Sequence, residues 1–181
     1  MQVIKTKIDD VLLIEPKVFG DPRGFFMESF NFRAWKEQTG IEFRFVQANH
    51  SRSAKNVLRG IHYQLAHPQG KLVRVVGGAV FDVAVDLRRG SPTFGRWVGE
   101  TLSADNKRQL WVPEGFGHAF LVLSESADFL YQTTDYWHPE DEHCLLWNDP
   151  AVGIDWPLEG APLMSEKDLR GKRLNEAALY E

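Results

Sequence analysis

The sequence contains one cysteine, Cys144, in 181 residues. A single thiol cannot close a disulfide within the chain, so the chain is not a disulfide-stabilised scaffold and needs a hydrophobic core. There is no run of about 18 apolar residues, so no segment is expected to span a membrane. Residues 1–10 carry charges at Lys5, Lys7, Asp9 and Asp10 and lack the apolar stretch of a signal peptide. We therefore expect a cytoplasmic protein.

An excess of positive charge is also missing. The chain has 21 Lys and Arg against 25 Asp and Glu, which gives a net charge of −4. This balance argues against general binding to nucleic acid or to a membrane surface, but it leaves room for a local basic pocket. Hydrophobic residues make up 43% of the chain, and no linker, repeat or low-complexity segment interrupts it. We expect residues 1–181 to form a single domain.

Helix signals are scarce. Asn31 and Gly40 bracket one short helix predicted over 31–38, and Ser165 is the expected cap of another that begins near 165–168. Short apolar or alternating segments bounded by turn residues are frequent and predict strands at 11–15, 24–30, 43–49, 57–64, 71–76, 79–87, 96–102, 109–112, 118–123 and 129–134. An all-β antiparallel sandwich or barrel, such as a jelly roll, would bury them without long free edges.

The segment Arg59–Gln64, followed by Lys71, carries the clearest chemical signal. Arg59 and His62 lie in one predicted strand and Lys71 begins the next, so the histidine has a cation on either side of it in the sequence. Histidine moves protons near neutral pH, and arginine and lysine bind anions or stabilise developing negative charge. The combination indicates proton transfer on an anionic substrate.

Five further stretches accompany Arg59–Gln64 and Lys71, at residues 19–29, 46–51, 113–120, 129–137 and 165–168. Together, from Val3 to Asp168, they resemble the dTDP-4-dehydrorhamnose 3,5-epimerase family. The resemblance implies a cupin-like jelly roll and a homodimer with exchanged N-terminal strands. It also implies epimerisation of dTDP-4-dehydro-6-deoxy-D-glucose at C3 and C5 without metal or cofactor. The product would be dTDP-4-dehydro-L-rhamnose, a precursor of cell-surface polysaccharide.

Four catalytic residues follow from the resemblance. His62 matches the family's base, Asp168 the carboxylate that orients it, Tyr131 the proton donor, and Lys71 the stabiliser of the oxyanion. These residue types suit the reaction, because protons at C3 and C5 both lie next to the C4 carbonyl and their removal gives an enolate. A tyrosine with a pKa of about 10 is protonated at neutral pH and can deliver a proton.

The resemblance also implies a set of substrate-binding residues. Arg23 and Arg59 match positions that hold the diphosphate, and their guanidinium groups suit phosphate oxygens. Trp137 falls where the family usually has a tyrosine on the thymine ring, and tryptophan also stacks well on a base. The remaining matched positions are Glu28, Gln47, Ala48, Asn49, Lys71, His118, Glu142 and Lys167.

One geometric point needs an explanation. Arg59 and His62 are three residues apart, so in a regular strand their side chains would face opposite sides. We expect Gly60 to mark a bulge that lets both reach the pocket.

Three alternatives stay open from the sequence. A metal-dependent cupin would bring several histidines and carboxylates together, although no His-x-His pair occurs. A catalytically silent nucleotide-sugar binding module would not need an acid, a base and an orienting group. A related epimerase acting at C3 or C5 alone would share the fold and the catalytic pair. The other histidines, His50, His67, His138 and His143, are expected to be surface residues.

Overall fold

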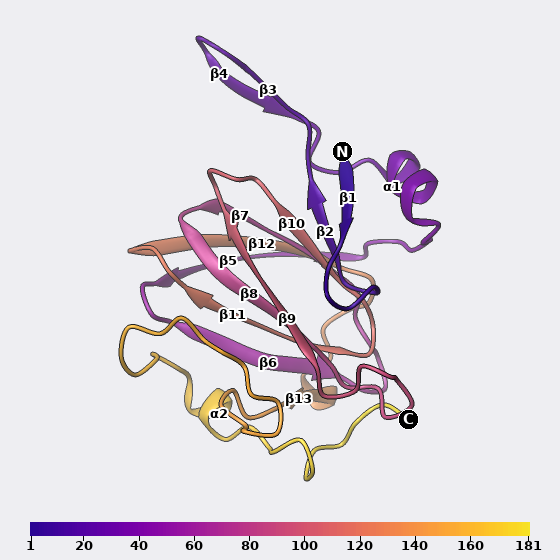
Figure 1. Cartoon of the computed structure of the whole chain (residues 1–181), viewed down its shortest axis with the longest axis vertical. Coiled ribbons are helices and arrows are strands. Elements are labelled where there is room, and N and C mark those ends of the chain that lie inside the picture. The colour runs from indigo at the N-terminus through magenta and orange to yellow at the C-terminus, as the bar shows by residue number, and fades with distance from the viewer.

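The computed structural model describes residues 1–181, and antiparallel strands dominate it (Figure 1). A six-stranded sheet has the order β1-β2-β10-β7-β12-β5, a five-stranded sheet the order β13-β6-β11-β8-β9, and β3 pairs only with β4. The strands are β1 (Gln2–Lys5), β2 (Leu12–Glu15), β3 (Val18–Asp21), β4 (Gly24–Met27), β5 (Gln47–Ala54), β6 (Leu58–Gln64), β7 (Lys71–Gly77), β8 (Ala79–Asp86), β9 (Trp97–Ser103), β10 (Gln109–Val112), β11 (Phe116–Val122), β12 (Ser126–Thr133) and β13 (Glu142–Cys144). The helical elements are α1 (Phe32–Thr39), α2 (Glu166–Leu169) and the 3-10 turn η1 (Pro139–Asp141).

The two large sheets enclose the central core. Val73 on β7, Phe120 on β11 and Phe129 on β12 are among its buried side chains, and Phe120 and Phe129 stack with centroids 4.3 Å apart. Burying apolar area stabilises the fold by roughly 25 cal/mol per Å². This packing confirms the predicted all-β sandwich and leaves few helices, as expected.

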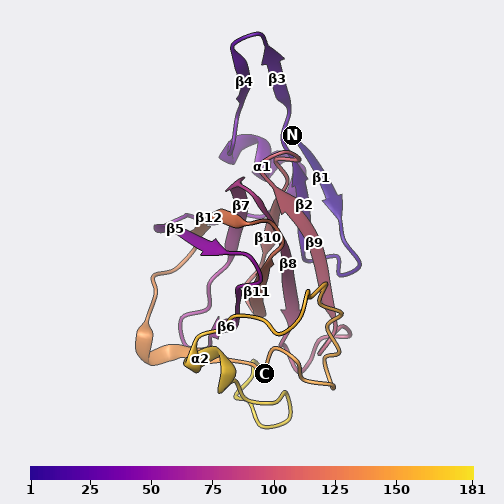
Figure 2. The same ribbon diagram turned by 90° about the vertical axis from the view of Figure 1, so that its left-hand side faces the viewer.

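Each sheet is also covered on its outer face. Trp35 of α1 packs with Trp111 of β10 and with Phe43 on the six-stranded sheet. The C-terminal segment 145–180 covers the five-stranded sheet, where Leu145 and Leu179 are buried (Figures 1 and 2). Because both faces of the five-stranded sheet are covered, the polar residues that alternate with apolar ones along β8 are buried too. Its carboxylates, Asp82 and Asp86, lie in the interior.

Both predicted helices are confirmed. The side chain of Asn31 accepts a hydrogen bond from the N–H of Ala34, and Gly40 ends α1 with a φ of 70°. The side chain of Ser165 accepts from the N–H of Asp168 and caps α2. Nearly all the predicted strands are present within one to three residues of their expected ends.

The expected strand 43–49 is displaced, because the strand β5 begins only at Gln47 and runs on to Ala54. Phe43 and Phe45 precede it and pack with each other at 4.5 Å on the outer aromatic cluster. A run of aromatic residues can cover a sheet as well as lie in one. The prediction also missed β1, β3 and β13, which are short.

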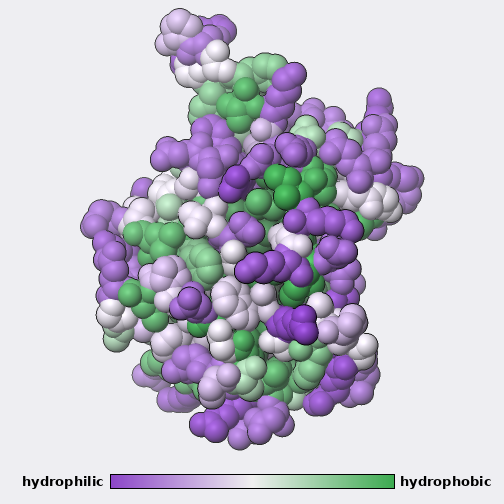
Figure 3. Space-filling view, in the orientation of Figure 1, coloured by the Kyte–Doolittle hydropathy of each residue, from purple (hydrophilic) through white to green (hydrophobic).

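The β3–β4 hairpin, here called the arm, projects away from both sheets (Figures 1 and 2). The arm comprises residues 18–27, and the predicted strand 24–30 forms only its second half. Phe19, Phe25 and Phe26 are 53%, 61% and 71% exposed. Figure 3 shows hydrophobic atoms on this projection below a hydrophilic tip. No helix in the chain is both long and apolar enough to cross a membrane.

Candidate active site

Arg59 and His62 both face the space between the sheets. His62 pairs with His118 on β11, and Arg59 pairs with Phe120. Three steps along β6 therefore match two along β11, which is the geometry of a bulge. Gly60 lies within it at a φ of 113°, and a Cβ there would stand 2.5 Å from the carbonyl oxygen of His118. The predicted bulge is confirmed, and only glycine fits at its centre.

His62 is held by a buried carboxylate. Its Nε2 lies 2.6 Å from Oδ1 of Asp168, and the Asp168 side chain is only 5% exposed. The other oxygen, Oδ2, accepts the N–H of Gly60 at 3.3 Å. Burial opposes ionisation, but the hydrogen bond and charge of His62 lower the pKa of Asp168. An ionised carboxylate in this position orients the imidazole and stabilises its protonated form.

Tyr131 and Lys71 lie on the inner face of the opposite sheet. Tyr131 pairs with Val73 of the central core, and Lys71 is two residues before Val73 on the same face of β7. Burial lowers the pKa of Lys71 to about 8, against the charges of Glu142 and Asp82. Burial also raises the pKa of Tyr131, so its hydroxyl stays protonated at neutral pH. The site therefore holds a neutral donor and a cation with a depressed pKa.

Glu142 connects the rim of the site. It forms an ion pair with Lys167, and it accepts a hydrogen bond from the indole Nε1 of Trp137 at 3.2 Å. Burial opposes ionisation of Glu142, but Lys167, His62 and Trp137 lower its pKa. The backbone N–H of Trp137 donates to Oε1 of Gln47 at 3.0 Å. These contacts gather residues from three distant parts of the chain.

The predicted substrate-binding residues of β5 lie on two different faces of the strand. The side chain of Gln47 donates to that of Asn49 at 2.9 Å, so both lie on the inner face. Ala48 lies between them with its side chain on the other face, and only its main chain can meet a ligand there. Arg59 on β6 donates from Nε to the hydroxyl of Ser53, which lies farther along β5, at 3.0 Å.

His118 is buried and pairs with Asp82, whose carboxylate oxygens both lie 3.0 Å from its Nε2. Burial raises the pKa of Asp82, and the charge of His118 opposes this. In the sequence Asp82 alternates with the apolar residues of its strand, which predicts a polar face and indicates no role for the carboxylate. The alternation of β8 did carry a signal, since it separates Asp82 from Phe81 and Val83, but it could not show that both faces are buried.

The sequence also missed the placement of Cys144. It pairs with His62 across β13 and β6, and its Sγ lies within 4.8 Å of the ligand atoms of His62 and Asp168. Burial raises the pKa of the thiol to about 12, so it remains protonated. The pairing of β13 with β6 depends on a strand of three residues, which carries almost no sequence pattern.

Arg23 and Glu28 are not brought into this site by their own chain. Arg23 lies at the tip of the arm, where its guanidinium contacts Asp21 at 2.6 Å and its side chain is 90% exposed. Glu28 follows β4 and accepts a hydrogen bond from Asn31 at 3.0 Å. The projection of the arm in Figures 1 and 2 separates its tip from the two sheets.

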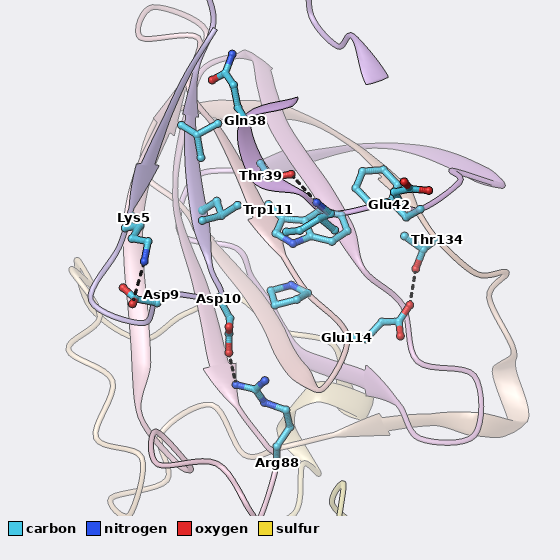
Figure 4. Close-up of a pocket in the computed structure, with 15 residues that line it drawn as sticks. Lys5, Asp9, Asp10, Gln38, Thr39, Glu42, Arg88, Trp111, Glu114 and Thr134 are labelled. Atoms are coloured by element: carbon cyan, nitrogen blue, oxygen red, sulfur yellow. Dashed lines mark hydrogen bonds and ion pairs between the residues drawn. The ribbon is translucent and has the colours of Figure 1, made fainter. Parts of the chain in front are cut away.

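A separate cavity of about 690 Å³ lies on the outer face of the six-stranded sheet (Figure 4). Trp111 lines it, and around the rim Lys5 pairs with Asp9 and Arg88 with Asp10. None of the predicted catalytic or substrate-binding residues lines this cavity, so it is not the predicted active site despite its volume.

Comparison with known proteins agrees with the geometry. The family model of dTDP-4-dehydrorhamnose 3,5-epimerase matches residues 5–176. The chain is 64% identical over 180 residues to the dTDP-4-dehydrorhamnose 3,5-epimerase of Pseudomonas aeruginosa, with 99% of both sequences covered. It is 58% identical over 182 residues to that of Salmonella typhimurium, with 100% of both covered.

A solved structure gives the same result. The dTDP-6-deoxy-D-glucose-3,5-epimerase of Legionella pneumophila, in complex with dTDP-4-keto-L-rhamnose, matches with a TM-score of 0.94 at 57% identity. The match covers 96% of this chain and 93% of that one. This chain therefore belongs to the dTDP-4-dehydrorhamnose 3,5-epimerase family and is an isomerase.

Proposed function

We propose that the protein converts dTDP-4-dehydro-6-deoxy-D-glucose to dTDP-4-dehydro-L-rhamnose, as a step of dTDP-rhamnose biosynthesis. The observation that carries this proposal is the His62–Asp168 pair, in which Nε2 and Oδ1 lie 2.6 Å apart. Tyr131 and Lys71 lie on the inner face of the opposite sheet. A base, an acid on another wall and a cation are the groups that inversion next to a carbonyl requires.

The proton transfers use one group from each sheet. His62 accepts the proton from C5 or C3, the C–H electron pair forms a double bond to C4, and the C4 carbonyl electron pair moves to its oxygen to give the enolate. Protonated Lys71 stabilises the enolate oxygen, and Asp168 stabilises the imidazolium that has formed. Tyr131 then returns a proton to the carbon from the opposite face, which inverts its configuration. Solvent restores the proton of Tyr131 and removes that of His62.

The nucleotide end would be held by the rim. Trp137 offers an exposed indole to the thymine ring, and Lys167 beside Glu142 offers a cation and a carboxylate. Arg59, Gln47 and Asn49 line the inner faces of β6 and β5, where they suit diphosphate oxygens. His118, held by Asp82, would contact the sugar.

The two predicted binding residues that lie outside the site, Arg23 and Glu28, would be supplied by a second copy of the chain. Arg23 and Glu28 lie on or beside an arm whose three phenylalanines stay more than half exposed, although the ammonium groups of Lys17 and Lys107 lie over the rings of Phe19 and Phe25. In a homodimer with exchanged N-terminal strands, the arm of one protomer would bury these rings and bring its guanidinium to the diphosphate of the other.

The direct test is incubation with dTDP-4-dehydro-6-deoxy-D-glucose in D₂O containing EDTA, followed by NMR of C3 and C5. We expect deuterium at both carbons and conversion to the L-rhamno product. Deuterium at one carbon would instead assign a single-carbon epimerase. Exchange that requires added divalent metal would indicate a metal-dependent cupin, and no exchange under any condition would indicate a binding module.

A further inference from the structure

A second cluster of imidazoles and a carboxylate lies outside the catalytic site. His67 follows β6, and Asp135 and His138 follow β12. One ligand atom from each lies within 4.8 Å of the other two. The two imidazole rings are stacked, with centroids 3.8 Å apart and planes 13° apart.

The metal-binding atoms of this cluster are largely unused by the protein. The ring of His67 makes no hydrogen bond, and its Nδ1 stands 3.7 Å from Oδ2 of Asp135. The N–H of Tyr136 donates to Oδ1 of Asp135 at 2.8 Å, which leaves Oδ2 free. Nδ1 of His138 lies 3.3 Å from Glu140, which leaves its Nε2 free. A carboxylate on the far ring nitrogen is the usual way to orient a metal-binding histidine.

The backbone under the cluster is fixed by glutamine side chains. Gln64 is 3% exposed, donates to the carbonyl oxygen of His67 at 2.7 Å and accepts the N–H of His138 at 2.8 Å. Gln69 donates to the carbonyl oxygen of Asp135 at 2.9 Å. Two segments that are about 70 residues apart in sequence are thus held together before any ligand binds, which lowers the entropy lost on binding.

Two imidazoles and one carboxylate suit a borderline transition metal such as Zn²⁺, Co²⁺ or Ni²⁺. Such an ion needs ligand atoms about 2.0–2.2 Å away, closer together than here, so the rings must turn toward one point. The side chains of His67, Asp135 and His138 are 46%, 38% and 30% exposed, so they have room to turn. Three protein ligands would leave a coordination position to water.

We propose that His67, Asp135 and His138 form a binding site for one divalent transition-metal ion, separate from the catalytic pair and not required for proton transfer. The expectation from the sequence was that no residue binds metal, and the stacked histidines are the structural reason to depart from it. Trp137 lies between Asp135 and His138, and its N–H bonds to Gln47. A bound ion would therefore restrain the segment that presents the indole to the nucleotide.

The test uses the untagged full chain, stripped with EDTA and then freed of it, at a pH of about 7.5, where imidazole is mostly neutral. Zn²⁺ binding is measured by titration calorimetry, and Co²⁺ binding by the absorption of its d–d bands. We expect one ion per chain. His67→Asn and His138→Asn should each weaken binding at least about tenfold, since even groups that only orient a ligand contribute that much.

Two variants sharpen this test. Asp135→Asn keeps an oxygen for the N–H of Tyr136 but removes the anionic ligand, so it should weaken binding while the circular dichroism spectrum and melting temperature without metal stay those of the parent. His50→Asn removes an exposed histidine that also pairs with an aspartate, Asp128, but has no second imidazole beside it. This control should bind Zn²⁺ as tightly as the parent.

Two results would overturn the proposal. One is absence of stoichiometric binding, or binding that is equal in the parent, His67→Asn and His138→Asn. The other is a thiolate-to-cobalt charge-transfer band that disappears in Cys144→Ser, because it would place the ion at His62, Cys144 and Asp168 instead. Neither result depends on epimerase activity, so failure here is distinguishable from failure of the proposed reaction.

Discussion

The two parts of the predicted site differ in how their own chain supports them. His62 lies between two packed sheets and is fixed by Asp168, which is itself held by the Gly60 N–H and the cap of α2. Arg23 lies on an arm, 90% exposed in its side chain, and its guanidinium contacts only Asp21 of the same turn. The predicted acid–base groups are thus positioned by a single chain, whereas in the proposed function the outermost binding residues depend on a second copy of the chain.

The largest effect should come from the buried part. His62→Ala removes the base, and we expect turnover to fall by about 10³–10⁴, the upper range for general acid–base catalysis. Binding of dTDP, measured by calorimetry, should change little because the proposed nucleotide site lies on the rim, away from His62. Near-normal turnover in this variant would reassign the base and break the contrast between the two parts.

Asp168→Asn should lower kcat by about 10²–10⁴, because it removes the charge that orients His62 and stabilises its protonated form. The backbone N–H of Asp168 still donates to the Ser165 hydroxyl in this variant, so the circular dichroism spectrum should remain that of the folded parent. A loss of activity matched by a loss of folded protein would instead make Asp168 a structural residue.

Tyr131→Phe keeps the ring in the core but removes the donor. We expect product formation to fall by about 10²-fold, while deuterium still exchanges at one carbon, since removal of a proton does not need Tyr131. NMR in D₂O separates exchange from inversion. Unchanged product formation would show that another group supplies the proton.

Arg23→Ala tests the arm and should raise KM by roughly 10- to 100-fold with little change in kcat, since a charged hydrogen bond contributes about 1.5–3 kcal/mol. Gel filtration serves as the control, because the phenylalanines of the arm are untouched and the oligomeric state should not change. An effect on kcat alone would place Arg23 in the chemistry.

The smallest effect is a shift in pH dependence. Burial lowers the pKa of Lys71 to about 8, so the charge that stabilises the enolate is present below that pH and is lost above it. The kcat/KM of the free enzyme should therefore fall on the alkaline side with an apparent pKa of about 8. Lys71→Arg keeps its charge and should move this limb to higher pH, at some cost in rate. An unchanged alkaline limb would remove Lys71 from that role.

The sequence predicted the helices and strands outside the arm well, because the signals for them are local. Alternation located β8, Asn31 and Gly40 bracketed α1, and the spacing of Arg59 and His62 required a bulge at Gly60. These features depend on residues within a few positions of one another.

What the sequence did not predict depends on contacts between distant segments. The pairing of Asp82 with His118 and the position of Cys144 beside His62 arise from strand register, which no local pattern records. Phe43 was expected in a strand but covers the sheet together with Trp35 of α1, because hydrophobic burial is not directional. The sequence predicts an ordinary strand at 24–30, because no local pattern shows that the aromatic side chains of the arm stay mostly exposed in their own chain.

The most direct test of this account is complementation between His62→Ala and Arg23→Ala, assayed at a substrate concentration below KM. The two inactive or weakened homodimers are mixed, exchanged under mild denaturant and refolded. If the arm serves the partner's site, each mixed dimer contains one site with both His62 and Arg23, and about a quarter of parental activity should return for random pairing in a symmetric dimer. Activity no greater than the average of the two separate variants would contradict the account, because it would mean that Arg23 acts within its own chain or not at all.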